Sequence, residues 1–74
     1  MNRVITLDEL IDTLETNGEV SITNGIKELF IQVVDDKDGY SYVSSTNEEF
    51  GSSREAVEWA IEKMNGIKNI VTFE

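Results

Sequence analysis

Carboxylates are the only side chains in this chain from which an acid–base site could be built, because its 74 residues include no His and no Cys. Their absence excludes a nucleophile with a His or Cys base, a disulfide and the usual kind of zinc site. Three aspartates stand together at Asp35, Asp36 and Asp38, and Glu48 and Glu49 follow. Two carboxylates in different surroundings can divide acid and base work. The aspartates lie on a predicted exposed turn, where water solvates all of them alike, so we expect no enzyme.

The aspartate turn also has a faint likeness to a calcium loop. An EF-hand loop needs oxygen ligands at set positions, a Gly at the sixth and a bidentate Glu at the twelfth. With Gly39 in the sixth place, the first position is Val34 and the twelfth is Ser45. Because Val34 offers no side-chain oxygen, we expect a plain hairpin turn, with no metal and no cofactor.

The charge of the chain limits the class of partner. Fifteen acidic residues against six basic ones give a net charge of -9. Such a chain repels phosphate, so direct binding to nucleic acid is not expected. A net charge of about 2 to 8 is enough to keep a small domain dissolved. The excess has two interpretations: a solvated surface, or a rigid set of carboxylates that imitates nucleic acid in a basic groove.

The length and hydropathy of the chain predict a single domain, residues 1–74, in the cytoplasm. The longest apolar runs, such as residues 29–31, are far too short to cross a bilayer, and the N-terminal segment is no secretory signal. We therefore expect no membrane partner.

Two amphipathic helices are predicted, the first over about residues 7–16. Thr6 and Glu9 fit a capping box at its start, and Gly18 suits its end. The second follows a further capping-box pattern at residues 52–55 and ends at Asn65-Gly66. Apolar residues recur at helical spacing in both segments: Leu7, Leu10, Ile11 and Leu14, then Ala56, Val57, Ala60, Ile61 and Met64.

Alternating residues predict an antiparallel hairpin between the helices. Asn24-Gly25 favours a two-residue turn, which would place Thr23 opposite Ile26 and Val20 opposite Leu29. One face then carries Val20, Ile22, Leu29, Ile31 and Val33, and the other carries Ile26, Glu28, Phe30 and Gln32.

A third strand is predicted over residues 40–45, a loop over residues 47–52 and a short terminal strand over residues 70–73. The expected fold is therefore α+β, a three-stranded antiparallel meander with an optional C-terminal strand, packed by two helices in the order α-β-β-β-α-(β).

The aromatic residues fall into two groups. Trp59 adjoins the second helical stripe and is expected in the core. Tyr40 and Tyr42 share one face of the third strand and are candidates for contact with a partner. Phe30 and Ile26 are expected on the face away from the helices, where they would suit a homodimer or another protein partner.

Several segments carry a family resemblance through their order along the chain: residues 7–11, 20–22, 29–33, 38–39, 42–44 and the helix with Val57 and Ile61. In this order the chain resembles the small acidic anti-CRISPR proteins of phages and prophages, over about residues 7–64. In the type II-A members that it is similar to, the inhibitor covers the surface with which an RNA-guided CRISPR nuclease reads its protospacer-adjacent motif. Such nucleases read that motif with arginines and hold nucleic acid in a positively charged channel.

The resemblance implies a phage-encoded inhibitor that acts in the host cytoplasm and competes with target DNA. Lys37 departs from the family's acidic trend, and the family's acidic third helix has no counterpart at residues 67–73. Another CRISPR effector or defence enzyme therefore stays open as the target, and a non-enzymatic interaction module stays open as the alternative function. The residues expected to bind the partner are Asp35, Asp36, Asp38, Gly39, Tyr40, Tyr42, Glu48 and Glu49.

Overall fold

Helix α1 (Leu7–Asn17) begins at the predicted capping box. The Thr6 hydroxyl accepts a hydrogen bond from the Glu9 N–H, and the Glu9 carboxylate accepts one from the Thr6 N–H. The helix ends at Gly18, whose φ of 80° is easy only for glycine and whose N–H donates to the Leu14 carbonyl. The computed structural model describes residues 5–34 and 42–74, so the predicted aspartate turn lies outside the described residues.

Helix α2 (Ser53–Lys63) uses half of its predicted capping box. The Ser52 hydroxyl accepts from the Glu55 N–H, as expected. The Glu55 carboxylate, however, accepts from the N–H of Gly51. The side chain therefore caps the backbone one residue earlier than predicted. The helix stops before Asn65 and Gly66, both of which have positive φ.

The sheet has five antiparallel strands in the spatial order β4-β3-β2-β1-β5. The strands are β1 (Glu19–Thr23), β2 (Glu28–Val33), β3 (Tyr42–Ser44), β4 (Glu49–Phe50) and β5 (Thr72–Phe73), and a short 3-10 helix, η1 (Ile67–Asn69), precedes β5. The α+β class, the meander and the C-terminal strand are confirmed. The predicted loop over residues 47–52 is wrong in part, because Glu49 and Phe50 add a strand beside β3.

The predicted two-residue hairpin turn is wrong. Thr23 pairs with Glu28 and Val20 with Ile31, so four residues connect β1 to β2. The cause is the Asn24 side chain, whose Oδ1 accepts hydrogen bonds from the N–H groups of Ile26 and Lys27 at 2.9 and 2.7 Å. This side-chain turn extends the loop by two residues. A shift of two residues keeps the paired residues of β1 and β2 on their predicted faces, but Ile26, predicted on the second strand beside Glu28 and Phe30, lies in the loop.

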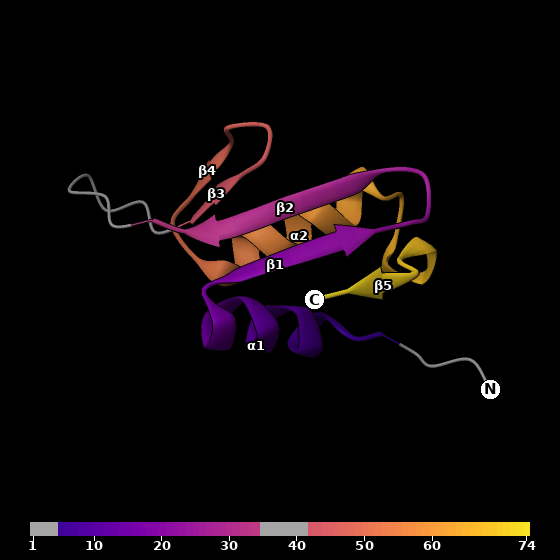
Figure 1. Cartoon of the computed structure of the whole chain (residues 1–74), viewed down its shortest axis with the longest axis horizontal. Coiled ribbons are helices and arrows are strands. Elements are labelled where there is room, and N and C mark those ends of the chain that lie inside the picture. Colours follow the sequence, from indigo (N-terminus) through magenta and orange to yellow (C-terminus); the bar gives the residue numbers. More distant parts are fainter. Residues whose placement is uncertain (1–4, 35–41) are drawn as a thin grey trace.

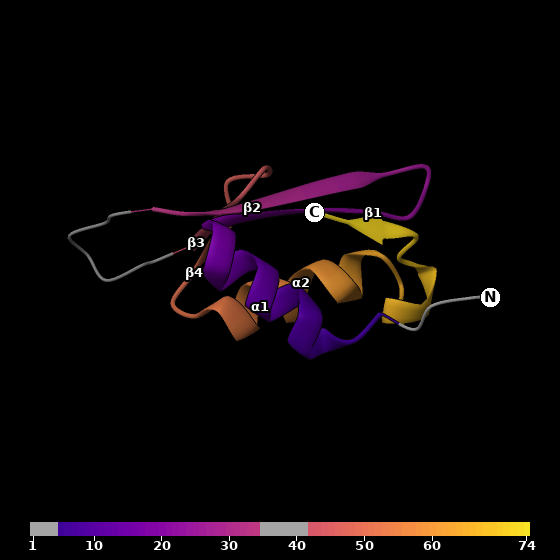
Figure 2. The same ribbon diagram turned by 60° about the horizontal axis from the view of Figure 1, so that its bottom comes forward.

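One face of the sheet packs against both helices (Figures 1 and 2). Val20, Ile22 and Ile31 are fully buried there, and Leu10 and Leu14 of α1 are buried against them. Helix α2 contributes Ala56, Val57, Ala60 and Met64 to the same core. Val33 ends β2 on this face, as predicted, but it is 46% exposed and lies outside the buried core.

The core extends to the edge of the sheet through an aromatic pair. Phe50 of β4 is buried, and its ring lies 5.4 Å from that of Trp59, tilted by 51°. The prediction that Trp59 belongs to the core is confirmed, since it is half-buried and packs against the core cluster.

The hairpin loop provides a test of this fold. Asn24→Ala removes the acceptor of two backbone N–H groups and should lower the free energy of unfolding by about 1 kcal/mol. Urea unfolding followed by circular dichroism measures this difference. Ile26→Ala in the same loop is the control, because Ile26 is 97% exposed and its truncation should cost less than about 0.5 kcal/mol. Equal stability of Asn24→Ala and the wild type would contradict the assigned role of Asn24.

Candidate functional site

The sheet face away from the helices is uncovered along the described strands (Figure 2). We call it the open face. Its residues alternate with the buried ones along each strand, as the pleat requires. They are Glu19, Ser21, Thr23, Glu28, Phe30, Gln32, Val43, Glu49, Thr72 and Glu74.

Strand register places four carboxylates around the margin of the open face. Glu49 and Glu19 lie at opposite ends of a row that crosses β4, β3, β2 and β1. Neighbouring strands lie about 4.8 Å apart, so this row spans about 14 Å. In the next row, Phe30 lies opposite Ser21, and Glu74 exchanges two backbone hydrogen bonds with Ser21. Glu28 lies opposite Thr23 in the third row, so Phe30 stands between the row that ends in Glu49 and Glu19 and the row that holds Glu28.

The carboxylates of the open face have few partners within the chain. Glu28 accepts a hydrogen bond from the Ser21 hydroxyl at 3.0 Å. Among the residues that the structure describes, Glu19, Glu49 and Glu74 have no side-chain hydrogen bond or ion pair, and no Lys or Arg lies on this face. All four glutamates are exposed. The open face can therefore offer these charges to a positively charged partner.

The outer sides of the helices are also acidic, but several of their carboxylates are already engaged. Glu58 forms a 3.3 Å ion pair with Arg54. Glu15 accepts a short hydrogen bond from the Ser53 hydroxyl, which joins the end of α1 to the start of α2. Asp8 and Glu62 remain exposed and unengaged among the described groups. Among residues 5–34 and 42–74, the negative charge is thus divided between two sides of the molecule, and of these two sides the open face is the one without a cation.

The structure distributes the described candidate residues over three places. Glu49 lies on the open face, paired across the strands with Val43. Glu48 lies in the turn before β4, where its N–H donates to the Ser44 hydroxyl. Tyr42 points to the helix side, where it is half-buried and packs against the core. Tyr42 and Glu49 therefore lie on opposite sides of the sheet.

The remaining candidate residues, Asp35, Asp36, Asp38, Gly39 and Tyr40, lie outside the described residues. Sequence analysis also missed Glu19, Glu28 and Glu74 as members of one surface. Alternation along the first two strands was the signal that could have placed Glu19 and Glu28 together. The position of Glu74 depends on β5 pairing with β1, which the sequence did not indicate.

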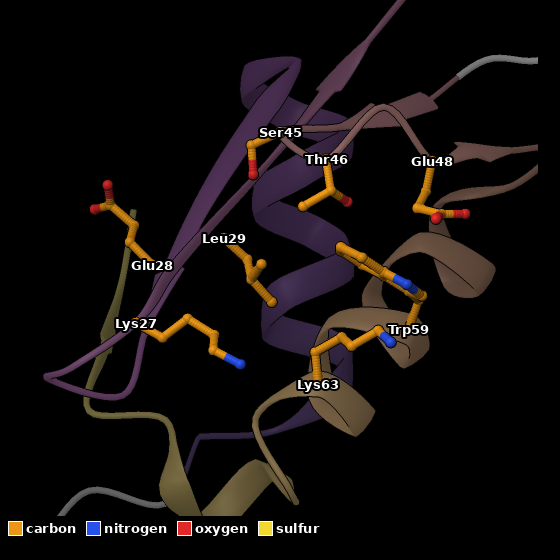
Figure 3. A pocket seen from close by; sticks show the side chains of 8 residues that line it. All are labelled: Lys27, Glu28, Leu29, Ser45, Thr46, Glu48, Trp59 and Lys63. Atoms are coloured by element: carbon orange, nitrogen blue, oxygen red, sulfur yellow. The ribbon is translucent and has the colours of Figure 1, made fainter.

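A second site lies at the edge of β2, where the turn before β4 and helix α2 enclose a pocket of about 490 Å³. Lys27, Leu29, Trp59 and Lys63 line it, together with the hydroxyl-bearing residues Ser45 and Thr46 (Figure 3). Sequence analysis missed this pocket because its members come from three separate segments, residues 27–29, residues 45–48 and helix α2.

Within residues 5–34 and 42–74, no group of three acidic side chains is placed to hold a metal ion. No helix in this part of the chain is long and apolar enough to cross a membrane. Comparisons of the chain with protein-family models, with curated proteins and with solved structures find no match.

The unbalanced charge predicts an unusual response to salt. Twelve described acids face four described bases, with one ion pair between them. Screening should therefore relieve net repulsion, and raising NaCl from about 10 mM to about 500 mM should increase the free energy of unfolding by roughly 1 kcal/mol. Urea unfolding at the two salt concentrations measures it.

The triple variant Glu19→Gln, Glu49→Gln, Glu74→Gln provides the comparison for this measurement, since it should gain less from added salt than the wild type. A wild-type stability that stays constant or falls with NaCl would show that the carboxylates do not repel one another in the folded chain.

Proposed function

We propose that this chain is a non-enzymatic acidic binding protein that occupies a basic, nucleic-acid-binding surface of another protein. The observation that supports the proposal most is the open face, on which Glu19, Glu49 and Glu74 have no partner and no described cation lies near them. Their positions are set by strand pairing, so the charges are presented in a fixed arrangement.

Phe30 at the centre of this face suits a protein partner better than a solvated surface. Phe30 is only half-buried; it lies opposite Ser21 on β1, and its backbone bonds to Ser45 on the other side. Binding hot spots are commonly central aromatic residues that a polar rim shields from water. The acidic rim would draw in the partner's Lys and Arg side chains and speed encounter, and Phe30 would supply apolar contact.

The proposed target is a nucleic-acid-binding defence protein, with a CRISPR effector nuclease first among the candidates. This choice comes from the sequence resemblance to type II-A anti-CRISPR proteins, and it makes the chain a phage-encoded inhibitor. The positive channel of such an effector is the kind of surface that the open face complements.

The alternative is an interaction module that dimerises through the same face. Phe30 and Val43 are half-buried and would gain apolar contact in a dimer. The four glutamates would then face those of a second copy, and like charges across an interface oppose binding. Sedimentation at low and high salt separates the two functions, because a dimer formed through this face should appear only where salt screens the glutamates.

Charge-neutral variants test the proposed surface. The triple variant Glu19→Gln, Glu49→Gln, Glu74→Gln should bind a guide-loaded type II-A effector about tenfold or more weakly, because it loses three charge contacts. It should also show a shallower dependence of affinity on salt. Competition with a fluorescent target DNA duplex for the effector measures both effects.

The matched control is Asp8→Asn, Asp12→Asn, Glu62→Gln, which removes the same charge from the outer sides of the helices. It should keep affinity within about threefold of the wild type, since those groups lie outside the proposed interface. Equal losses in the two variants would show that net charge alone acts.

A further variant tests the three aspartates of the predicted turn, which the sequence names as partner-binding residues. Asp35→Asn, Asp36→Asn, Asp38→Asn should also weaken binding and reduce its salt dependence, because screening acts on exposed charges. Unchanged inhibition by this variant would remove the aspartates from the proposed site and leave the open face.

A further inference from the structure

The pocket beside β2 collects an unexpected share of the positive charge of this acidic chain. Lys27, from the loop before β2, and Lys63, from the last turn of α2, both line it. The described part of the chain has only two other cations, Arg54 and Lys68. In Figure 3 the two lysines come from opposite sides of the pocket, Lys27 from beside β2 and Lys63 from α2, where its side chain runs toward Trp59. An anionic group in the pocket would be attracted by both charges.

Neither lysine is neutralised by a carboxylate among the described residues. Glu28 borders the pocket, but its carboxylate points away from the pocket centre (Figure 3) and accepts a hydrogen bond from Ser21. Glu48 lies at the rim without an ion pair. The two lysine charges therefore remain available to a ligand.

The floor of the pocket is apolar. Leu29 is 5% exposed, and Trp59 is half-buried with its ring against Phe50. The hydroxyl-bearing residues Ser45 and Thr46 line the opposite wall. The pocket thus combines an apolar floor with cations and hydroxyl groups, which suits a ligand with both an apolar group and an anionic end.

One wall of the pocket is an unpaired stretch of strand edge. Strand β3 pairs with β2 from Ile31 onward, and Phe30 exchanges its last bonds with Ser45. The Val33 N–H donates to the Gly18 carbonyl, and the Asn24 N–H donates to the Lys27 carbonyl. The backbone groups of Lys27 and Val33 therefore point toward β1. Backbone groups of successive residues in a strand point to opposite edges. The N–H and C=O of Glu28 therefore point away from β1, to an edge where no described strand lies.

We propose that this pocket binds an extended peptide with an acidic C-terminal residue. The peptide backbone would pair with the N–H and C=O of Glu28, an apolar side chain would rest on Leu29 and Trp59, and the terminal carboxylates would lie between Lys27 and Lys63. Addition of a strand to a free edge and capture of a terminal carboxylate are both established modes of peptide recognition.

A peptide fits these groups better than a nucleotide. The free N–H and C=O of Glu28 match the donor and acceptor of a peptide backbone, which a nucleotide does not offer in that alternation. The inference does not rest on the proposed function, because the pocket shares only Glu28 with the open face and uses the backbone of that residue.

Trp59 is the single tryptophan of the chain, so its fluorescence reports on the pocket directly. The probe is the peptide acetyl-Val-Thr-Val-Asp with a free carboxyl end, titrated into the whole chain. We expect a saturable change in Trp59 emission. The double variant Lys27→Gln, Lys63→Gln should weaken binding about tenfold, because two charge contacts are lost.

The double variant Arg54→Gln, Lys68→Gln is the control for net charge, since it also removes two exposed cations, outside the pocket. It should bind the peptide within about twofold of the wild type. A second peptide, acetyl-Val-Thr-Val-Asn with an amidated end, lacks both carboxylates. Its affinity for the wild type should be as low as that of the free-acid peptide for the variant Lys27→Gln, Lys63→Gln.

Several results would overturn the proposal: no saturable change in Trp59 emission, equal weakening in the two double variants, or equal binding of the amidated peptide. Adenosine monophosphate is titrated in the same way as the peptide. Tighter binding of the nucleotide than of the peptide would also overturn the proposal and make the pocket a nucleotide site.

Discussion

The fold depends on one constraint, which is that both helices cover the same face of the sheet. Val20, Ile22 and Ile31 are fully buried because Leu10 and Leu14 of α1 pack onto them. Ala56 and Ala60 of α2 are small enough for a close approach to the same layer. The chain has no further long helix in its described part. No described helix covers the other face of the sheet, and the side chains of this face take no part in the described core.

This arrangement separates stability from binding. The apolar half of each strand holds the two layers together, and the polar half of the same strands forms the open face. Four glutamates without a cation nearby raise the electrostatic cost of folding, since like charges on a compact chain repel one another. Such a cost is easiest to understand where a positively charged partner relieves it, and this is the physical basis of the proposed function.

Local features of the fold could be predicted from the sequence because they depend on neighbouring residues. The capping box of Thr6 and Glu9 and the apolar stripes of the two helices are confirmed. The assignment of residues to faces in the first hairpin is confirmed even though its turn was wrong, because the extra loop residues number two. Strand β4 was missed, since two residues are too few to show alternation.

The sites could be predicted less well because they depend on pairing between distant segments. Glu74 joins the open face only through the bonds of the chain end to Ser21. Lys27 and Lys63 meet at one pocket through the packing of α2 beneath β2. No spacing along the chain signals either contact. Charge composition predicted an acidic surface, and tertiary structure determines where that surface lacks cations.

Carboxyl footprinting of the chain bound to a guide-loaded type II-A effector tests the central claim most directly. Carbodiimide labelling modifies accessible carboxylates, and mass spectrometry of the free and bound chains assigns the change to each residue. We predict strong protection of Glu19, Glu49 and Glu74 in the complex, with Asp8, Asp12 and Glu62 labelled as in the free chain. Protection of the helix-side carboxylates with the open face still reactive, or no protection at either surface, would contradict it.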